Sequence, residues 1–115
     1  MSILITGATS KMGSYLWQRL VERDEVKEIF ILTRNVKLFE KNLKQHFGFV
    51  DELAFPFSKI KIIHGDLAHE ESFFYLQTMP QIDLCIHMAA LTHTTSDNDY
   101  FLVNFQATIK LAQYF

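Results

Sequence analysis

The stretch that decides the fold of this 115-residue chain is ILITGATSKMG, residues 3–13. It opens with three apolar residues, a pattern typical of a short buried strand in a parallel sheet. Gly7 follows almost at once and permits a sharp turn, because glycine adopts backbone angles that other residues avoid. Apolar residues at helical spacing begin at Met12. The stretch therefore predicts a strand, a tight turn and a helix, and Gly13 would let that helix pack close to the strand.

The turn over residues 6–13 has the chemistry of an anion site. A turn from a strand into a helix leaves backbone N–H groups at the positive end of the helix dipole, where a pyrophosphate binds favourably. Two glycines, Gly7 and Gly13, directly after an apolar strand favour a dinucleotide at this turn. The alternative is an ordinary turn in which the glycines serve steric needs alone. We favour the nucleotide because later segments agree with it.

The remainder of the chain continues the alternation of strand and helix. Residues 49–58 predict a loop or a short helix that tucks aromatic side chains under the sheet. This order places the chain in the α/β class, as a parallel sheet with helices on both faces. Right-handed crossovers then give the strand order 3-2-1-4 of a dinucleotide-binding half. We expect strands at residues 3–5, 28–33, 59–64 and 82–87, and helices at residues 11–21, 36–47, 70–79 and from about residue 100 to the end.

Composition argues against several classes of partner. Hydrophobic residues make up 49% of the chain, which suffices for one core, and most of the phenylalanines are expected there. The net charge of −2 and the lack of a basic run argue against nucleic-acid binding. No apolar stretch reaches the roughly 18 residues that cross a bilayer. The lone cysteine, Cys85, is expected to be buried and reduced. With no signal-peptide pattern at Met1, these features predict a cytoplasmic protein.

Four motifs resemble those of the extended short-chain dehydrogenases/reductases. That family includes nucleotide-sugar epimerases and dehydratases and reductases that act on acyl thioesters. The motifs occur in the family's order and on the expected elements, and the resemblance implies a Rossmann-type NAD(P)-binding domain over residues 1–115. They are residues 3–16, similar to the TGxxGxxG opening; His64-Gly65-Asp66-Leu67, similar to "GDL"; Ile86-His87-Met88-Ala89-Ala90, similar to "HxAA"; and Asn104-Phe105-Gln106-Ala107-Thr108, similar to "NvxGT".

One position in the glycine turn departs from the family. Ser10 stands where the family usually has glycine. Its N–H and its hydroxyl could still face a phosphate, but its Cβ crowds the close approach that glycine allows. Lys11 next to it would either pair with the phosphate or remain a solvated surface lysine.

The end of the second strand bears on the choice of nucleotide. Thr33 stands where NAD users of the family commonly carry aspartate, and Arg34 follows it. Without a carboxylate there is no repulsion of a 2′-phosphate, and a guanidinium can bind that phosphate with two hydrogen bonds and stack on adenine. This favours NADP(H) over NAD(H). The alternative is that Arg34 is a solvated residue at the start of a helix.

The resemblance also implies roles for residues that follow the third and fourth strands. Asp66 would accept a hydrogen bond from the adenine amino group, and Leu67 would pack beside the ring; the plainer alternative for Asp66 is a helix cap. The three residues after His87 would admit the ribose and pyrophosphate, or form only a tight junction. The five histidines are scattered and predict no metal site. The predicted cofactor-binding set is Gly7, Thr9, Ser10, Lys11, Met12, Gly13, Arg34, Asp66, Leu67, Met88, Ala89 and Ala90.

The family's catalytic Tyr-x-x-x-Lys spacing does not occur in these residues. Tyr15, Tyr75 and Tyr100 are each followed four positions later by a residue other than lysine. We therefore expect the nucleotide-binding portion of a longer enzyme, ending before the fifth strand, with no catalytic residue and no turnover. The parent's substrate would be a nucleotide-linked sugar or an acyl thioester, and the last helix would serve a homodimer by analogy. The alternatives are a non-catalytic NAD(P)-binding regulatory or interaction module and an unstable fragment.

Overall fold

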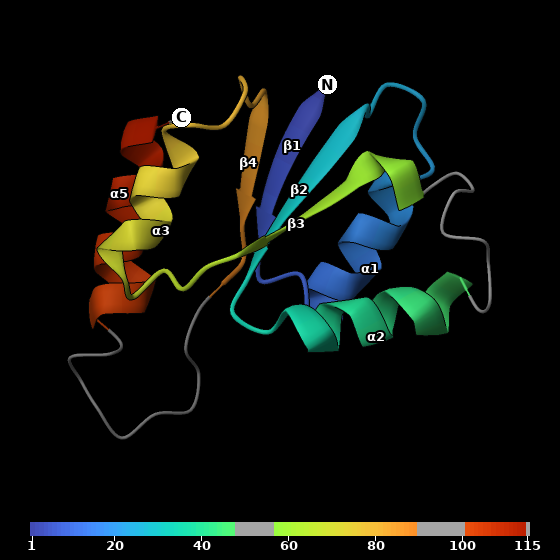
Figure 1. Ribbon diagram of the computed structural model, residues 1–115, viewed down its shortest axis with the longest axis horizontal. Helices are drawn as coiled ribbons and strands as arrows, with labels where there is room; N and C mark the ends of the chain where they lie inside the picture. The colour runs from blue at the N-terminus through green and yellow to red at the C-terminus, as the bar shows by residue number, and fades with distance from the viewer. Residues whose placement is uncertain (48–56, 90–100, 115) are drawn as a thin grey trace.

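The computed structural model describes residues 1–47, 57–89 and 101–114, and it shows one sheet with helices on either side (Figure 1). Within this part of the chain, the helix expected at residues 70–79 ends at Leu76, because residues 77–79 form a turn before Pro80. The strands are β1 (Ser2–Thr6), β2 (Glu28–Thr33), β3 (Ile60–His64) and β4 (Leu84–His87); the helices are α1 (Lys11–Leu20), α2 (Val36–Phe47), α3 (Glu70–Leu76) and α5 (Ala107–Tyr114), with a 3-10 turn η1 (Phe57–Lys59) and a π-helical stretch η2 (Phe101–Gln106).

The four strands form one parallel sheet in the order β3-β2-β1-β4. β1 occupies the centre, where Leu4 faces Phe30 of β2 on one side and Cys85 of β4 on the other. The predicted α/β class, strand order and parallel direction are confirmed. Because all four strands run in one direction, the loops that follow them gather at one edge of the sheet.

Two apolar layers hold the helices on opposite faces of this sheet. Alternate residues of a strand point to opposite faces, so Ile3 and Ile5 join one layer and Leu4 joins the other. The first layer includes Trp17 of α1 and Phe39 of α2, whose rings meet edge to face at 5.3 Å. The second packs under α3 and α5. Figure 1 shows these two pairs of helices on the two sides of the sheet, which confirms the predicted three layers.

The edge strand β4 has no fully buried residue, whereas each of the other three strands has at least one. Leu84 is exposed and Cys85 is only half-buried, because no described strand covers the outer side of β4. Burial still raises the pKa of the Cys85 thiol. The expectation of a fully buried cysteine is therefore wrong. Among the phenylalanines with described side chains, Phe30, Phe39 and Phe73 are in the core, whereas Phe105 is exposed.

A buried lysine joins the start of β3 to the end of α1. Lys59 lies in η1, one residue before the strand that was expected to begin with it. Its Nζ donates hydrogen bonds to the carbonyl oxygens of Val21 at 3.2 Å and Arg23 at 2.9 Å. Those carbonyls lie at the end of α1, where a cation also opposes the negative end of the helix dipole. None of the helices described is long and apolar enough to span a membrane.

Candidate functional site

A cleft of about 320 Å³ opens at the edge of the sheet where the parallel strands end. Residues that follow β1, β2, β3 and β4 all contribute to its wall, because the sheet brings these four strand ends together. It gathers eight of the twelve residues that the sequence predicted for the site. The lining consists of Gly7, Thr9, Ser10, Leu32, Thr33, Arg34, Asn35, Leu38, Gly65, Asp66, Leu67, Met88 and Ala89.

The other predicted residues lie outside that lining for three different reasons. Lys11 and Met12 are exposed on the first turn of α1, and Met12 is 75% exposed. Gly13 is buried beneath the turn. Ala90 falls outside the described residues. The structure thus gives Gly13 a packing position instead of a place on the cleft wall.

Gly7 and Gly13 are both required by close backbone contacts. Gly7 has φ +78°, and a Cβ there would lie 2.5 Å from the carbonyl carbon of Met88. A Cβ on Gly13 would lie 2.1 Å from the carbonyl oxygen of Gly7. Neither position has room for a side chain. The turn is therefore drawn tightly against both α1 and the chain after β4.

Ser10 is the N-cap of α1. Its Oγ accepts the N–H of Gly13 at 3.0 Å and donates to the carbonyl oxygen of Gly7 at 2.8 Å. Its own N–H bonds to the same Gly7 oxygen at 3.2 Å. The hydroxyl and the amide that were expected to face a phosphate are thus engaged within the turn. The serine that replaces glycine stabilises the start of the helix.

Two backbone amides at the start of α1 remain for a ligand. Within the described part of the chain, no group accepts a hydrogen bond from the N–H of Lys11 or Met12. Both belong to the first turn, where the helix dipole is positive, and no acidic side chain lies there. Such a helix start has the free donors and the partial charge that suit an anion.

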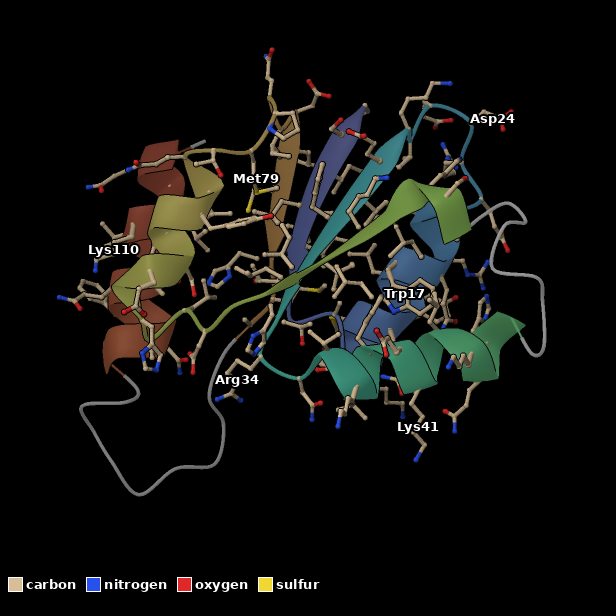
Figure 2. All side chains as sticks on the ribbon, in the orientation of Figure 1. Trp17, Asp24, Arg34, Lys41, Met79 and Lys110 are labelled. Atoms are coloured by element: carbon tan, nitrogen blue, oxygen red, sulfur yellow. The ribbon has the colours of Figure 1, made fainter. Side chains whose placement is uncertain are left out.

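The end of β2 presents one basic side chain to the cleft. Thr33 is buried, and its Oγ1 accepts the N–H of Asn35 at 3.1 Å. Asn35 caps α2, since its Oδ1 accepts the N–H of Leu38 at 3.0 Å. Arg34 between them is exposed, and its side chain extends away from the sheet beyond the end of β2 (Figure 2). The side chains of Thr33 and Asn35 are engaged in these backbone bonds, so the Arg34 guanidinium is the charged group at the end of β2.

Asp66 follows β3, beside the end of β2, and lies in a side-chain-capped turn. Its Oδ1 accepts the N–H of Ala68 at 2.9 Å, and its Oδ2 lies 3.7 Å from Nε2 of His69. Because α3 begins only at Glu70, Asp66 is not the cap of that helix, and the helix-cap alternative is wrong. The half-exposed carboxylate retains acceptor capacity toward the cleft.

Ser72 is a site residue that sequence reasoning missed. Its buried Oγ accepts the N–H of Asp66 at 2.8 Å and donates to the carbonyl oxygen of Asp66 at 2.9 Å. Gly65 admits this serine, because a Cβ there would lie 3.0 Å from that same Oγ and 2.6 Å from Leu32. The glycine in the sequence "GDL" was the available signal, and the serine six residues after Asp66 carried none.

Thr6 is the second residue that the sequence did not single out. Its side chain is fully buried, and its Oγ1 accepts the N–H groups of Met88 and Ala89, each at 3.1 Å. The N–H groups of these two residues are therefore engaged within the protein, although both residues line the cleft. His87 lies 2.6 Å from the same oxygen, and burial lowers the pKa of its imidazole. No group of three or more potential metal ligands occurs among the described residues.

The cleft combines the features that a nucleotide needs. Its volume is at the small end of typical ligand sites, and apolar side chains alternate along it with a few polar groups. Free amides at a helix start suit a diphosphate, and the close packing of Gly7 and Gly13 holds the turn that carries those amides. Acceptors at Asp66 and an apolar wall at Leu67 suit an adenine ring.

Comparison with known proteins agrees with this chemistry. Residues 3–115 match the sequence model of the NAD dependent epimerase/dehydratase family. A thiolation-reductase di-domain from an archaeal non-ribosomal peptide synthetase is 28% identical, with a TM-score of 0.74 over 98% of this chain and 25% of that one. The terminal R domain from the myxalamid PKS-NRPS biosynthetic pathway is 25% identical, with a TM-score of 0.73 over 98% of this chain and 30% of that one.

A third structure shows the same fold at lower identity. A UDP-glucuronic acid 4-epimerase from Bacillus cereus, solved with NAD, is 22% identical and has a TM-score of 0.70. The alignment covers 99% of this chain and 36% of the epimerase. The present chain thus spans between a quarter and two fifths of the length of these three relatives.

Proposed function

The chain belongs to the NAD-dependent epimerase/dehydratase family, and on that premise we propose that its cleft binds the dinucleotide of an extended short-chain dehydrogenase/reductase. The family implies a nicotinamide dinucleotide cofactor, which carries hydride when bound. The residues of this chain bind and orient it: the first turn of α1 takes the diphosphate, and Asp66 and Leu67 take the adenine. Ala90 is included by the family resemblance alone.

One observation carries this proposal. The N–H groups of Lys11 and Met12 have no acceptor within the described chain, and they lie at the start of a helix that borders the cleft. Gly7 packs directly against the Met88–Ala89 peptide and Gly13 against Gly7, which fixes the turn that carries these amides. Free donors on a fixed helix start are the feature that a diphosphate requires.

We further propose that the cofactor is NADP(H). Arg34 is the basic residue among those that line the cleft, and Asp66 is the acidic one. Thr33 occupies the position where an NAD-binding site holds a carboxylate. It is buried, and its hydroxyl oxygen accepts the N–H of Asn35. A 2′-phosphate near Arg34 therefore meets a cation and no opposing anion at the end of β2.

The test of this preference is a titration with NADPH and with NADH, followed by nicotinamide fluorescence. Arg34→Ala should weaken NADPH binding about tenfold, the equivalent of roughly 1.4 kcal/mol for one exposed charge-assisted contact. NADH affinity should change much less. Lys37→Ala is the matched control, because Lys37 is an exposed cation on the same turn that does not line the cleft. Equal affinity for both cofactors in the unmodified protein would contradict the NADP(H) preference.

We also propose that this chain is the nucleotide-binding portion of a longer parent enzyme. We propose that it reduces an acyl thioester or converts a nucleotide-linked sugar, and the reductase relatives at 25% and 28% identity favour the thioester. No Tyr-x-x-x-Lys spacing occurs in the 115 residues, so they should bind the dinucleotide without turnover. A non-catalytic nucleotide-binding module is the second candidate, and the same observation favours it.

A further inference from the structure

A chain of hydrogen bonds runs from the wall of the cleft to helix α5. Thr6 Oγ1 lies 2.6 Å from Nδ1 of His87, and Nε2 of His87 lies 3.0 Å from Oγ1 of Thr108. The three residues come from β1, β4 and α5. His87 therefore sits between the strand that leads into the glycine turn and a helix on one face of the sheet.

The first bond of this chain has a defined direction. Thr6 Oγ1 accepts the N–H of Ala89, and it shares the N–H of Met88 with the carbonyl oxygen of Thr6, which lies at the same 3.1 Å. Its single proton is then left to donate, and the atom that faces it is Nδ1 of His87. Nδ1 must therefore be unprotonated.

The second bond follows from the first. A neutral imidazole with a bare Nδ1 carries its proton on Nε2, which donates to Oγ1 of Thr108. Thr108 in turn donates its own proton to the carbonyl oxygen of Asn104 at 3.1 Å. Every donor in the chain finds an acceptor only when His87 is neutral and protonated on Nε2.

The peptide that Thr6 holds is the one against which the glycine turn packs. A Cβ placed on Gly7 would lie 2.5 Å from the carbonyl carbon of Met88 and 2.6 Å from the nitrogen of Ala89. Met88, Ala89 and Gly7 all line the cleft. A shift of this peptide would therefore move the turn as well.

We propose that His87 is a positioning residue for the dinucleotide cleft: in its neutral, Nε2-protonated form it fixes the Thr6 hydroxyl, and through it the Met88–Ala89 peptide and the Gly7 turn, and it ties them to α5. This role rests on the proposed function, since it concerns binding at the same cleft. His87 is not itself part of the cleft lining, and it acts through Thr6.

Protonation of His87 would break this arrangement. A proton on Nδ1 would place another donor at Thr6 Oγ1 and leave the hydroxyl proton without an acceptor. The bond from the Ala89 amide would then weaken, while the Met88 N–H would keep the carbonyl oxygen of Thr6. The surroundings do not favour the cation, because burial already lowers the pKa of His87. β1 and β4 carry no charged side chain, and the one other titratable group on them is the Cys85 thiol.

The charged side chains discussed next, on α5 and after β3, have interaction partners of their own. On α5, Lys110 holds its Nζ 5.4 Å from the centre of the Phe73 ring. Across the cleft, Asp66 bonds the N–H of Ala68 and lies 3.7 Å from His69. These are the groups whose own titration must be separated from that of His87.

The hydrogen-bond direction can be measured without any ligand. Long-range ¹H–¹⁵N correlation spectra of the histidine rings should show His87 with its proton on Nε2, and the amide signals of Met88 and Ala89 should move as His87 titrates below pH 6.5, the ordinary value for histidine. In His87→Asn those two amides should stay unmoved over the same range. A proton on Nδ1 at neutral pH would overturn the proposal.

The role in binding is tested with NADP⁺ by calorimetry as the pH is lowered. The unmodified protein should lose affinity about fivefold once His87 is protonated, the equivalent of one net hydrogen bond. His87→Asn keeps an acceptor near the position of Nδ1 and does not titrate, so its affinity relative to the unmodified protein should rise as the pH falls. The ratio of the two dissociation constants cancels the titration of Asp66, of His69 and of the ligand's own phosphate.

Two variants test the hydrogen bond between His87 and Thr108 of α5. Thr108→Val should weaken binding about fivefold by the same reasoning, and Thr108→Ser should restore it, because serine keeps the acceptor. Identical pH dependence in the unmodified protein and His87→Asn would overturn the role of His87. Absence of dinucleotide binding at every pH would instead refute the proposed function, while the ring spectra would still decide the hydrogen-bond direction.

Discussion

At the scale of the residue, Ser10 is the position where this chain departs most clearly from the pattern of its family. Its hydroxyl satisfies the N–H of Gly13, and its Cβ projects beside the cleft that Ser10 helps to line. Serine therefore strengthens the start of α1 and narrows the approach of a diphosphate. These two effects can be separated by substitution.

Ser10→Gly should bind NADPH more tightly than the unmodified protein, because it removes the Cβ. It should lower the free energy of unfolding by only a few tenths of a kcal/mol, since glycine is a tolerable N-cap. Ser10→Ala should cost about 1 kcal/mol of stability without the gain in affinity, because the Cβ remains. Fluorescence titration and urea denaturation measure the two quantities. Equal affinity in both variants would show that the Cβ does not obstruct the site.

Residues that act through local chemistry were predictable, and residues that act across the sheet were not. Gly7 could be predicted because its φ of +78° follows from the tight turn after an apolar strand. The bonds from Thr6 to Met88 and Ala89 join positions more than 80 residues apart. Their geometry depends on β4 lying beside β1, and no local pattern in the sequence indicates which hydroxyl will meet which amide.

At the scale of the element, the connection between α1 and β3 depends on Lys59. Its buried ammonium donates to the carbonyl oxygens of Val21, the C-cap of α1, and of Arg23, just beyond it. Lys59→Met should keep the apolar stem but leave Val21 and Arg23 without these bonds. We expect a loss of about 1–3 kcal/mol in the free energy of unfolding.

Lys61→Met is the control for that loss, because Lys61 lies two residues further along, on β3, and is exposed. Its substitution should change stability by less than about 0.5 kcal/mol. Denaturation with urea under identical conditions compares the two variants. Equal effects would show that the contact with α1 contributes nothing beyond the loss of one surface charge.

The elements themselves followed from hydrophobic periodicity, and their ends did not. The four strands and the helices α1 and α2 were found where the pattern placed them, because apolar runs and helical spacing are local properties. Helix α3 is shorter than expected, since Thr78 and Met79 bond back to Tyr75 and Leu76 in turns before Pro80. Most of the loop or short helix expected at residues 49–58, and the expected start of the last helix at about residue 100, fall outside the described residues.

At the scale of the whole molecule, stability should depend on pH through His87. Its pKa in the folded state is below the ordinary value of 6.5 because of burial, so the unfolded chain binds the proton more readily. The contribution of His87 to stability is therefore fully present above pH 6.5 and is lost as the pH falls from there through the lowered folded-state pKa.

His87→Asn should lack this component, so the difference in urea midpoint between the two proteins should shrink or reverse as the pH falls below 6.5. The other histidines and the carboxylates titrate in both proteins and cancel in that difference. A difference that stays constant across the same range would mean that His87 has the same pKa in the folded and unfolded chains.

The central claim is that the turn between β1 and α1 offers its backbone amides to a dinucleotide diphosphate. The most direct measurement is a titration of the ¹⁵N-labelled protein with NADPH, following each backbone amide. We predict saturable shifts at Gly7, Thr9, Lys11 and Met12, joined by Arg34 and Asp66 after the neighbouring strands β2 and β3. Binding that leaves the amides of Lys11 and Met12 unmoved, or no binding at all, would contradict the account.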